Sequence, residues 1–308
     1  MEFIRKTLEF QVEEPTAVTL GKFDGLHRGH DLLMQTVLEY SKEFSLASVA
    51  FTFDIPPRNK VEEIVANVLT TNEEKEYIFE KRGLDYLIEC PFTTEVMSME
   101  PKDFIAWISK SLHMKYVVVG DDFRFGHKRA GDFHTLKQYE EEYGYKTIVI
   151  DKLKDSNRDI SSTYVREKIA EGNIPKANEL LGYKYFIKSE ILHGRKLGRT
   201  IGIPTINMIL PPDKLLPPNG VYVTEVLVGG KTYMGVTNIG CKPTVSDEKI
   251  VGVETYIDDF TQDVYGEKIV VSFIQFIRPE QKFDSVEELR RQMQLDIEKS
   301  RELYITQK

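Results

Sequence analysis

Cysteine is scarce in this 308-residue sequence. The only two, Cys90 and Cys241, lie far apart and have no CxxC or Cys/His ligand spacing around them. The sequence therefore indicates neither a disulfide scaffold nor a zinc site, and buried, unreactive thiols are the expected alternative.

Long hydrophobic runs are also absent. No uninterrupted apolar stretch approaches the roughly 18 residues of a membrane span. Residues 1–11 alternate charged and hydrophobic side chains, where a signal peptide would carry an apolar segment. We therefore expect a cytoplasmic protein without a membrane partner, and no feature of the sequence specifies its oligomeric state.

Positive charge is in deficit, because 41 lysines and arginines stand against 49 aspartates and glutamates, which gives a formal net charge of −8. Affinity for a nucleic-acid backbone is built from clustered cations, and this chain also lacks a platform of interleaved aromatic and basic residues. Nucleic acid is therefore not expected as a partner, and the local basic clusters are expected to bind a smaller anion.

The length predicts two domains, because a single hydrophobic core rarely grows beyond about 250 to 300 residues. In the first part, short apolar runs alternate with amphipathic stretches, which is typical of a doubly wound α/β domain with a parallel sheet. Helices are expected at 31–43, after Thr71, and at 101–112. The expected strands are 17–21, 46–53, 84–90, 116–120 and 146–150.

The residue pattern changes after Gly182, where alternating runs separated by turn residues predict an antiparallel β-barrel. Gly229-Gly230 is a two-residue hairpin signal, and Ser285 with Glu288 is a capping box that opens a final helix. We therefore expect domains at 1–182 and 183–308. The expected barrel strands are 186–192, 221–228, 232–236, 253–257 and 268–277.

A glycine-rich motif, GKFDGLHRGH at 21–30, joins the first expected strand to the first expected helix. Such a turn before a helix N-terminus forms an anion site, and His27 and His30 can project on one side of the helix's first turn. The motif is neither the GxGxxG of dinucleotide binding nor the GxxxxGK[ST] of P-loops, so hydride transfer and P-loop chemistry are disfavoured.

A second helix start, ISSTYVR at 160–166, carries hydroxyls at the cap positions and Arg166 one turn later. A simple helix cap is the plain interpretation of Ser-Ser-Thr before a helix. With the arginine, the same residues can also hold a polyphosphate. Nucleotidyl transfer needs an exposed α-phosphate and a neutralised pyrophosphate, which imidazoles, helix N-termini and an arginine can supply.

Together these motifs resemble the nucleotidylyltransferase superfamily. With VGDDFRFG at 119–126, they are similar to the adenylyltransferase half of prokaryotic bifunctional riboflavin kinase/FAD synthetases. The resemblance implies residues that bind ATP and its phosphates, residues that hold the departing pyrophosphate, and residues that bind the flavin. In that order they are Gly21, Phe23, His27, Gly29 and His30; Ser162, Thr163 and Arg166; and Asp122, Phe123 and Phe125.

One position departs from the family's pattern. After the second strand the family commonly has Pro-His-Pro, with the histidine near the transferring phosphate, whereas this chain reads FDIPPR at 53–58. Pro56 replaces that histidine, and a proline ring can neither donate a hydrogen bond to phosphate nor carry charge. We therefore expect adenylyl transfer to be weakened, although ATP can still bind.

The second part carries a basic, glycine-rich segment that ends in Pro-Thr-x-Asn, HGRKLGRTIGIPTIN at 193–207. Thr205 and Asn207 lie on the same side if this end is extended, and a hydroxyl with an amide oxygen suits Mg²⁺ shared with substrate phosphates. Backbone amides and basic side chains of the preceding loop can cover ATP. A solvated surface loop is the alternative for the charged part alone.

Glu254 is a single carboxylate in a strand-like run, and taken alone it is an ordinary exposed-face residue. However, HGxxxGRxxGxPTxN, the later GVTNIG at 235–240 and this glutamate are together similar to riboflavin kinase domains. The resemblance implies that Glu254 is the base that accepts the proton of a riboflavin ribityl hydroxyl, and that Thr205 and Asn207 handle magnesium-ATP. The further ATP-binding residues that it implies are Gly194, Gly198, Arg199 and Gly202.

The resemblance thus predicts a bifunctional transferase that phosphorylates riboflavin to FMN and adenylylates FMN to FAD. ATP would be the co-substrate of both steps, Mg²⁺ the metal, and FMN and FAD the product ligands. One alternative is a riboflavin kinase with a weak or inactive adenylyltransferase domain, which Pro56 alone favours. The other is a non-catalytic flavin-sensing regulator, which would have no need of Glu254, Thr205 and Asn207 together.

Overall fold

The computed structural model describes residues 1–54, 67–192, 202–242 and 250–306. By its internal contacts the chain divides into two units, Met1–Ser162 and Thr163–Lys308. The domain boundary expected near Gly182 is later in the chain, where helix α8 (Ile174–Leu181) ends, and it stays a prediction. None of the helices in the described ranges combines the length and the hydrophobicity of a membrane span.

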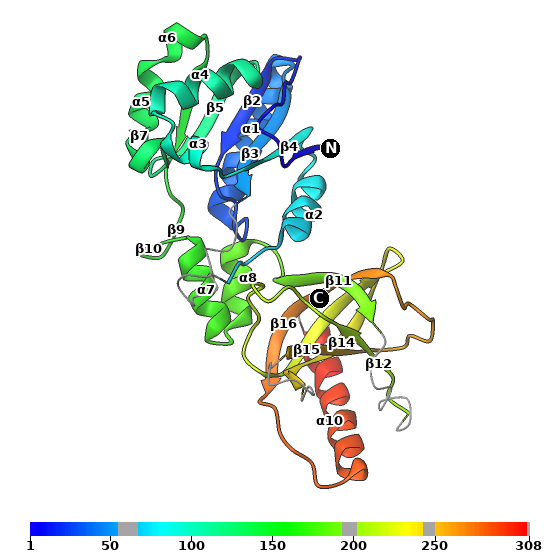
Figure 1. The fold of residues 1–308 in the computed structure, drawn as a ribbon. Coiled ribbons are helices and arrows are strands. Elements are labelled where there is room, and N and C mark those ends of the chain that lie inside the picture. Colours follow the sequence, from blue (N-terminus) through cyan, green and yellow to red (C-terminus); the bar gives the residue numbers. More distant parts are fainter. Residues whose placement is uncertain (55–66, 193–201, 243–249, 307–308) are drawn as a thin grey trace. The chain divides into compact units, whose positions relative to one another are not determined.

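A six-stranded sheet forms the centre of the first unit (Figure 1). Every neighbouring pair of its strands is parallel, as the continuous apolar runs predict. In spatial order the strands are β1 (Glu2–Arg5), β4 (Tyr86–Pro91), β3 (Ala47–Asp54), β2 (Thr16–Leu20), β5 (Met114–Gly120) and β8 (Lys146–Ile150). Only β1 was not expected, because its four residues carry a charge at each end and only two apolar side chains.

Helices cover both faces of this sheet, which confirms the doubly wound arrangement. Val18 and Leu20 of β2 belong to one apolar cluster with Phe104 of α4 (Pro101–Ser111). The alternate residues of β2 point to the opposite face, where α1 (Arg28–Phe44) contacts β2, β3 and β5.

The remaining helices of this unit are α2 (Asn72–Arg82), α3 (Thr94–Ser98), α5 (Phe133–Gln138) and α6 (Glu140–Tyr143), with a 3₁₀ turn at His127–Arg129. Two short antiparallel pairs complete it: β6 (Arg124–Phe125) with β7 (Gly131–Asp132), and β9 (Lys154–Asp155) with β10 (Arg158–Asp159).

Cys90 lies in the same apolar cluster and is completely buried. Burial, with a smaller contribution from the Glu89 carboxylate, raises the pKa of its thiol to about 12. The thiolate is therefore not populated at neutral pH, as expected for an unreactive core cysteine. The side chain of Cys241 is outside the described part of the chain.

The order of the strands reverses between β2 and β5. The chain first proceeds from β2 to β3 and β4 on one side, and then returns to pair β5 with the other side of β2. At such a switch point the loops beyond the carboxyl ends of the two strands diverge and leave room for a ligand. Residues 21–27 follow β2 and residues 121–122 follow β5. The motifs GKFDGLHRGH and VGDDFRFG therefore both lie at this switch point.

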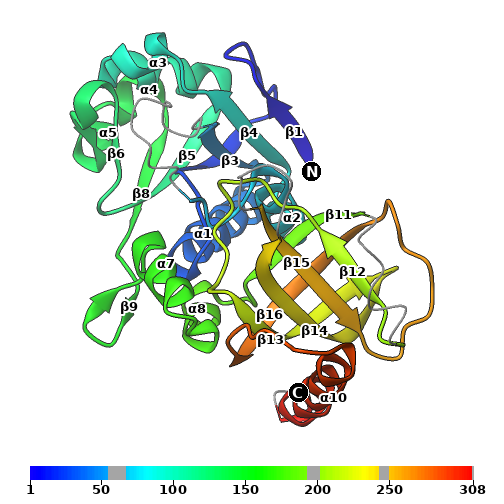
Figure 2. The ribbon, with the colours of Figure 1, turned by 60° about the horizontal axis from the view of Figure 1, so that its bottom comes forward.

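The second unit contains a closed six-stranded antiparallel barrel (Figure 2). The hairpin between β13 and β14 has the expected two residues, Gly229 and Gly230, with φ of 54° and 77°. In spatial order the strands are β11 (Phe186–Leu192), β12 (Thr205–Met208), β15 (Ile250–Ile257), β14 (Lys231–Lys242), β13 (Gly220–Val228) and β16 (Lys268–Arg278). Helix α7 (Ser162–Ala170) and α8 precede the barrel in sequence, and α10 follows it.

The C-terminal helix α10 (Val286–Ile305) packs against β13, β14 and β16 (Figure 2). It begins where the sequence predicts, because the Ser285 hydroxyl accepts a hydrogen bond from the backbone N–H of Glu288. The Glu288 carboxylate accepts from the N–H of Asp284 instead of Ser285, so the expected capping box is only half formed. Val286, the first residue of the helix, is exposed.

The barrel strands present one face to the interior and one to α10. Thr224, Thr237 and Thr255 are completely buried, and their hydroxyls are hydrogen bonded in a chain at 2.8 and 2.9 Å. These three threonines mark the interior face. Because successive residues of a strand point to opposite faces, Asn238 and Glu254 point outward.

Candidate active sites

The loop between β2 and α1 has a strained backbone at the switch point. Phe23, Gly25 and Leu26 all have positive φ, of 49°, 79° and 34°. Non-glycine residues rarely adopt this region unless the surrounding structure enforces it, and such positions gather at functional sites. His27 occupies the N-cap position of α1, and its side chain makes no capping hydrogen bond. The first N–H groups of the helix can therefore donate hydrogen bonds to an anion.

Hydrogen bonds from distant segments hold this loop. The Asp24 carboxylate accepts from the backbone N–H groups of Leu69 and Thr70 at 2.8 and 3.2 Å, and Gly25 N–H donates to the Thr70 hydroxyl at 3.1 Å. The Ser162 hydroxyl donates to the backbone carbonyl of Asp24 at 2.7 Å. Ser162 is therefore joined to the glycine-rich motif although 138 positions separate it from Asp24.

Aromatic rings explain two of the glycines. The Phe23 side chain is completely buried and makes edge contacts with the rings of Phe79 and His30, both at 5.4 Å between centroids. A Cβ atom at Gly21 would approach the Phe23 ring to 3.0 Å, and one at Gly29 would approach the His27 ring to 3.2 Å. Phe23 and the glycines therefore shape the loop by packing, and a nucleotide could contact them through the backbone.

The two histidines form a stacked pair with ring centroids 3.9 Å apart and an angle of 19° between the rings. Burial lowers the pKa of His27 to about 4, although the Asp122 carboxylate opposes this shift. Burial, and then the neighbouring His27, lower the pKa of His30 well below its usual range. Both imidazoles are therefore neutral at pH 7. Among the described residues, neither Nδ1 atom has a hydrogen-bond partner although both are buried, which is typical of a site that a ligand completes.

Two carboxylates follow β5 on the other side of the switch point. The exposed Asp122 forms an ion pair with Lys152 at 3.0 Å, and this hydrogen bond is the main cause that raises the lysine's pKa. Asp121 has one carboxylate oxygen, Oδ1, that is buried and has no partner among the described residues. Sequence reasoning missed Asp121 and Lys152. The position of Asp121 next to Asp122 was the only available signal.

The two phenylalanines expected at the flavin have different surroundings. The rings of Phe123 and Phe125 are stacked with centroids 5.5 Å apart. Phe125 is buried and contacts Phe104 of the sheet's apolar cluster at 5.3 Å, whereas Phe123 is only partly buried. Phe123 is therefore the better placed of the two to contact a ligand, with Phe125 as its support.

Helix α7 carries the remaining residues expected in the first site. Ser162 is its first residue, Thr163 follows and is exposed, and Arg166 lies one turn further and is partly buried. The division between the two units falls between Ser162 and Thr163. Pro56, the expected weak point of this site, lies outside the described residues.

The second candidate site is a row of side chains across the outer face of the barrel. β12 is extended, so Thr205 and Asn207 lie on one face, as the sequence predicts. Asn207 pairs in register with Glu254 of β15, and Glu254 pairs with Asn238 of β14. Directly opposed residues of antiparallel strands point to the same face, so these four polar side chains lie together.

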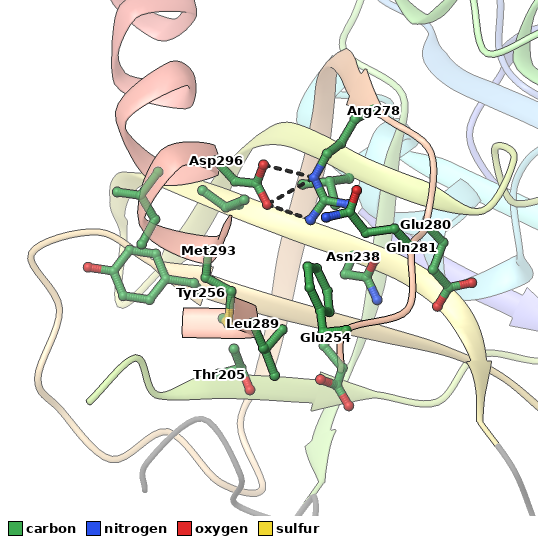
Figure 3. A pocket seen from close by; sticks show the side chains of 14 residues that line it. Thr205, Asn238, Glu254, Tyr256, Arg278, Glu280, Gln281, Leu289, Met293 and Asp296 are labelled. Carbon is green, nitrogen blue, oxygen red and sulfur yellow. Dashed lines mark hydrogen bonds and ion pairs between the residues drawn. The ribbon is translucent and has the colours of Figure 1, made fainter. Parts of the chain in front are cut away.

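A cavity of about 280 Å³ lies between this outer face and α10 (Figure 3). Polar groups on its wall include Thr205, Asn238 and Glu254, and the apolar part is formed by both the barrel and the helix. The lining residues are Thr205, Val221, Val236, Asn238, Glu254, Tyr256, Arg278, Glu280, Gln281, Phe283, Leu289, Met293, Asp296 and Ile297. An apolar cavity with a few convergent polar groups is the usual form of a small-molecule site.

An ion pair fixes the wall that α10 contributes. The Arg278 guanidinium donates to Asp296 from Nε at 2.9 Å and from Nη2 at 2.7 Å (Figure 3). It also donates to the carbonyl of Pro279 at 3.0 Å. Asp296 is buried, and Gln292 donates to it as well, at 2.9 Å. The end of β16, the segment after it and α10 are thereby joined at the cavity.

A second ion pair joins α10 to Asp258, the residue directly after β15, and here the helix carries the positive charge. Arg301 of the helix donates to both carboxylate oxygens of Asp258, at 2.7 and 2.9 Å, and this hydrogen bonding lowers the pKa of Asp258. Asp258 also accepts from the hydroxyl of Tyr256 at 3.3 Å. Burial, and then Asp258, raise the pKa of Tyr256.

Several site residues expected from the sequence fall outside the described ranges, namely Gly194, Gly198 and Arg199. Gly202 is described, with φ of 78°, which disfavours any other residue there. Sequence reasoning missed Arg278, Glu280 and Asp296. The periodicity of their segments gave no signal, because they come together only through the closure of the barrel and the docking of α10.

Two protein-family models match the chain in sequence order: FAD synthetase at residues 9–164 and riboflavin kinase at residues 181–304. Among curated relatives, the bifunctional riboflavin kinase/FMN adenylyltransferase of Listeria monocytogenes is 35% identical over 93% of this chain and 92% of its own length. The protein of that name from Escherichia coli K12 is 36% identical over 95% of this chain and 94% of its own length.

A solved structure shares the fold along almost the entire chain. It is titled as the crystal structure of a macrolide-efflux protein from Streptococcus pneumoniae, with a TM-score of 0.85 and 30% sequence identity. The match covers 97% of this chain and 98% of that chain. Neither family model that matches this chain describes the activity in that title.

Proposed function

The chain belongs to the bifunctional riboflavin kinase/FMN adenylyltransferase family, and on that premise we propose how its residues divide the two reactions. It is a transferase that phosphorylates riboflavin to FMN and adenylylates FMN to FAD, with ATP as the substrate of both steps. We assign the first step to the outer face of the barrel and the second to the switch point of the sheet. The observation that carries this assignment is that each family model covers one of these two sites. Because both steps consume ATP, we place the enzyme in the cytoplasm.

In the kinase step, Glu254 is the proposed general base. Its carboxylate lines the cavity beside Asn238, where a ribityl chain can enter while the isoalloxazine ring fills the apolar part. The terminal hydroxyl of riboflavin gives its proton to Glu254 as the oxygen attacks the γ-phosphorus of ATP, and the bond from that phosphorus to the bridging oxygen of ADP breaks. A positioned carboxylate of this kind contributes roughly 10² to 10⁴ in rate.

Mg²⁺ is the metal that we propose for this step. The Thr205 hydroxyl and the Asn207 amide oxygen are hard oxygen donors on one face of β12, beside Glu254, and hard oxygen donors are what this cation prefers. In the described residues, no three His, Cys, Asp or Glu side chains gather as a metal-binding group. The ion would therefore be shared with ATP phosphates, whose charge it neutralises.

In the adenylylation step, the neutral imidazoles of His27 and His30 and the N-terminus of α1 are proposed to hold the ATP phosphates. A phosphate oxygen of FMN attacks the α-phosphorus of ATP, and the bond to the bridging oxygen of pyrophosphate breaks. Neutral imidazoles suit this role because they donate a hydrogen bond without the cost of a buried charge. Thr163 and Arg166 are proposed to hold the departing pyrophosphate, and Asp122 with Phe123 the flavin.

The direct test is a product assay on the purified full-length chain. Riboflavin, ATP and Mg²⁺ are supplied, and FMN and FAD are separated and quantified over time. We expect FMN to appear first and FAD to follow from it. If FMN forms and never becomes FAD, the adenylyltransferase assignment is wrong; if no FMN forms, the kinase assignment is wrong.

A further inference from the structure

We propose that Glu280 is a second substrate-contacting residue of the kinase site, where its carboxylate accepts a hydrogen bond from a hydroxyl of the ribityl chain. The inference rests on the proposed kinase function and adds to it a determinant of substrate specificity. Glu280 lines the same cavity as Glu254 but comes from the segment between β16 and α10. Figure 3 shows both carboxylates at this cavity, together with Asn238.

The position of Glu280 follows from the strand register. Asn238 is paired with Val221 of β13, and Val221 is paired with Arg278 of β16. β14 and β16 both run antiparallel to β13, so they run in the same direction, and the residue two beyond Arg278 reaches the level of the residue two beyond Asn238. That residue of β14 is Gly240.

Gly240 has the space that the Glu280 carboxylate occupies. A Cβ atom built at Gly240 would overlap the carboxylate, and its three nearest neighbours would all be side-chain atoms of Glu280. Gly240 lies within strand β14, where glycine is unfavourable by itself. A close approach of another group is the usual reason for such a glycine, and here that group is a carboxylate.

Two contacts hold the carboxylate and its backbone. The Asn219 amide donates to one Glu280 carboxylate oxygen at 3.4 Å. Arg278 donates to the carbonyl of Pro279 while it binds the buried Asp296 of α10. The backbone immediately before Glu280 is thereby tied to the cavity wall, which reduces the conformational freedom that the side chain would lose on binding a substrate.

The spacing matches the chemistry of riboflavin. Two residues along a strand span about 6.6 Å. The Glu280 carboxylate lies over Gly240, two residues beyond Asn238, so the carboxylate stands about that distance from Asn238, the in-register neighbour of Glu254. A ribityl chain carries four hydroxyls over a comparable length. With its terminal hydroxyl at Glu254, an inner hydroxyl can reach Glu280, whereas the ring is left to the apolar wall of Phe283, Leu289 and Met293.

The test compares riboflavin with lumiflavin, which has the same ring and no hydroxyl chain. In the full-length protein, Glu280→Ala should raise the KM for riboflavin in FMN formation about tenfold, because a hydrogen bond to a charged acceptor is lost. The kcat should change less than threefold. Lumiflavin is used as a competitive inhibitor of the same reaction, and its Ki should be unchanged. Glu280→Gln keeps an oxygen acceptor and should raise the KM by only about threefold.

Gly240→Ala provides the matched variant. It should displace the carboxylate and raise the KM for riboflavin in the wild-type background, but it should add nothing when Glu280 is already alanine, because all three clashing atoms belong to Glu280. An unchanged KM in Glu280→Ala, or a Ki for lumiflavin that rises as much as the KM, would overturn the proposal. Failure of the kinase assignment itself is recognised separately, because the wild-type chain would then make no FMN.

Discussion

The site at the switch point and the site on the barrel differ in how their residues are collected along the chain. Most of the first site comes from one contiguous motif at residues 21–30, which a short loop presents between a strand and a helix. The second site takes one residue or two from each of β12, β13, β14, β15 and β16, and others from the segment after β16 and from α10. A local motif can be recognised from its letters, whereas an assembled surface depends on strand register and on helix docking.

Because the first site is a local motif and the second is assembled from several elements, different substitutions should disturb them. The first site has a strained backbone and buried imidazoles, so it should be sensitive to changes of charge and to substitutions within the motif itself. The second site lies between the barrel and α10, so it depends on the packing of this helix against the strands.

The stability of the barrel should depend on helix α8. The fragment 183–308 contains the predicted domain and should phosphorylate riboflavin, but the fragment 163–308 should be more stable by roughly 4 kcal/mol. The reason is that Ile174, Ala177, Leu180 and Leu181 of α8 are buried, and that Asn178 bonds to the backbone of Phe273 and Tyr185. Urea denaturation of both fragments measures the difference, and equal midpoints with equal slopes would show that α8 contributes nothing.

Glu254→Gln should reduce FMN formation by on the order of 10² or more, because the amide keeps the size of the side chain but cannot accept the proton. FAD formation from supplied FMN should be unaffected. Separate initial rates for the two steps provide the measurement. Turnover of riboflavin near the wild-type rate would remove Glu254 from the mechanism.

Asp296→Asn should destabilise the second unit by about 3 kcal/mol, because it leaves the Arg278 guanidinium without its carboxylate at a buried position. The matched control is Asp258→Asn at the other ion pair of α10. Its partner Arg301 has a side chain 51% exposed, so that change should cost about 1 kcal/mol or less. Thermal or urea unfolding compares the two variants, and equal losses would show that burial does not distinguish the ion pairs.

The pH dependence of stability should report on the histidine pair. His27 has a pKa of about 6.5 when unfolded and about 4 when folded, so the unfolded state takes up its proton first as the pH falls. Its contribution is complete above pH 6.5 and is lost as the pH falls towards 4, by about 2 kcal/mol between pH 7 and pH 5. His27→Asn should flatten this part of the profile in urea titrations. An unchanged slope would mean that the pKa of His27 is the same in the folded and the unfolded protein.

Pro56→His should raise the rate of FAD formation from supplied FMN by about tenfold, because it adds a hydrogen-bond donor near the transferring phosphate. The kinase rate should not change. This prediction comes from the sequence, since Pro56 lies outside the described residues. If the wild-type chain makes FAD from FMN as fast as it makes FMN from riboflavin, Pro56 does not handicap the first site.

The contrast between the sites also explains what could be predicted from the sequence. Periodicity predicted five of the six strands of the sheet, and turn chemistry predicted the hairpin at Gly229-Gly230 and the start of α10 at Ser285. In the first site, the letters of the motif named the histidines, but not the burial that keeps both of them neutral. That property depends on the rings packed around them.

In the barrel, the sequence named Glu254, Thr205 and Asn207 through a family resemblance, and alternation correctly placed the last two on one face. It gave no indication of the row that joins them to Asn238, because register depends on which strands pair. It also missed Arg278 with Asp296, because nothing local distinguishes a buried ion pair from two surface charges.

If the two sites of the chain act independently, two variants that are each impaired in one step should complement each other when they are mixed. Glu254→Gln should fail to make FMN from riboflavin, and His27→Asn should make FMN but convert it to FAD about a hundredfold more slowly than wild type. Supplied together with riboflavin, ATP and Mg²⁺, the two proteins should make FAD at a rate within a few-fold of the wild-type chain. If the mixture forms FAD no faster than His27→Asn alone does, the two sites do not act independently.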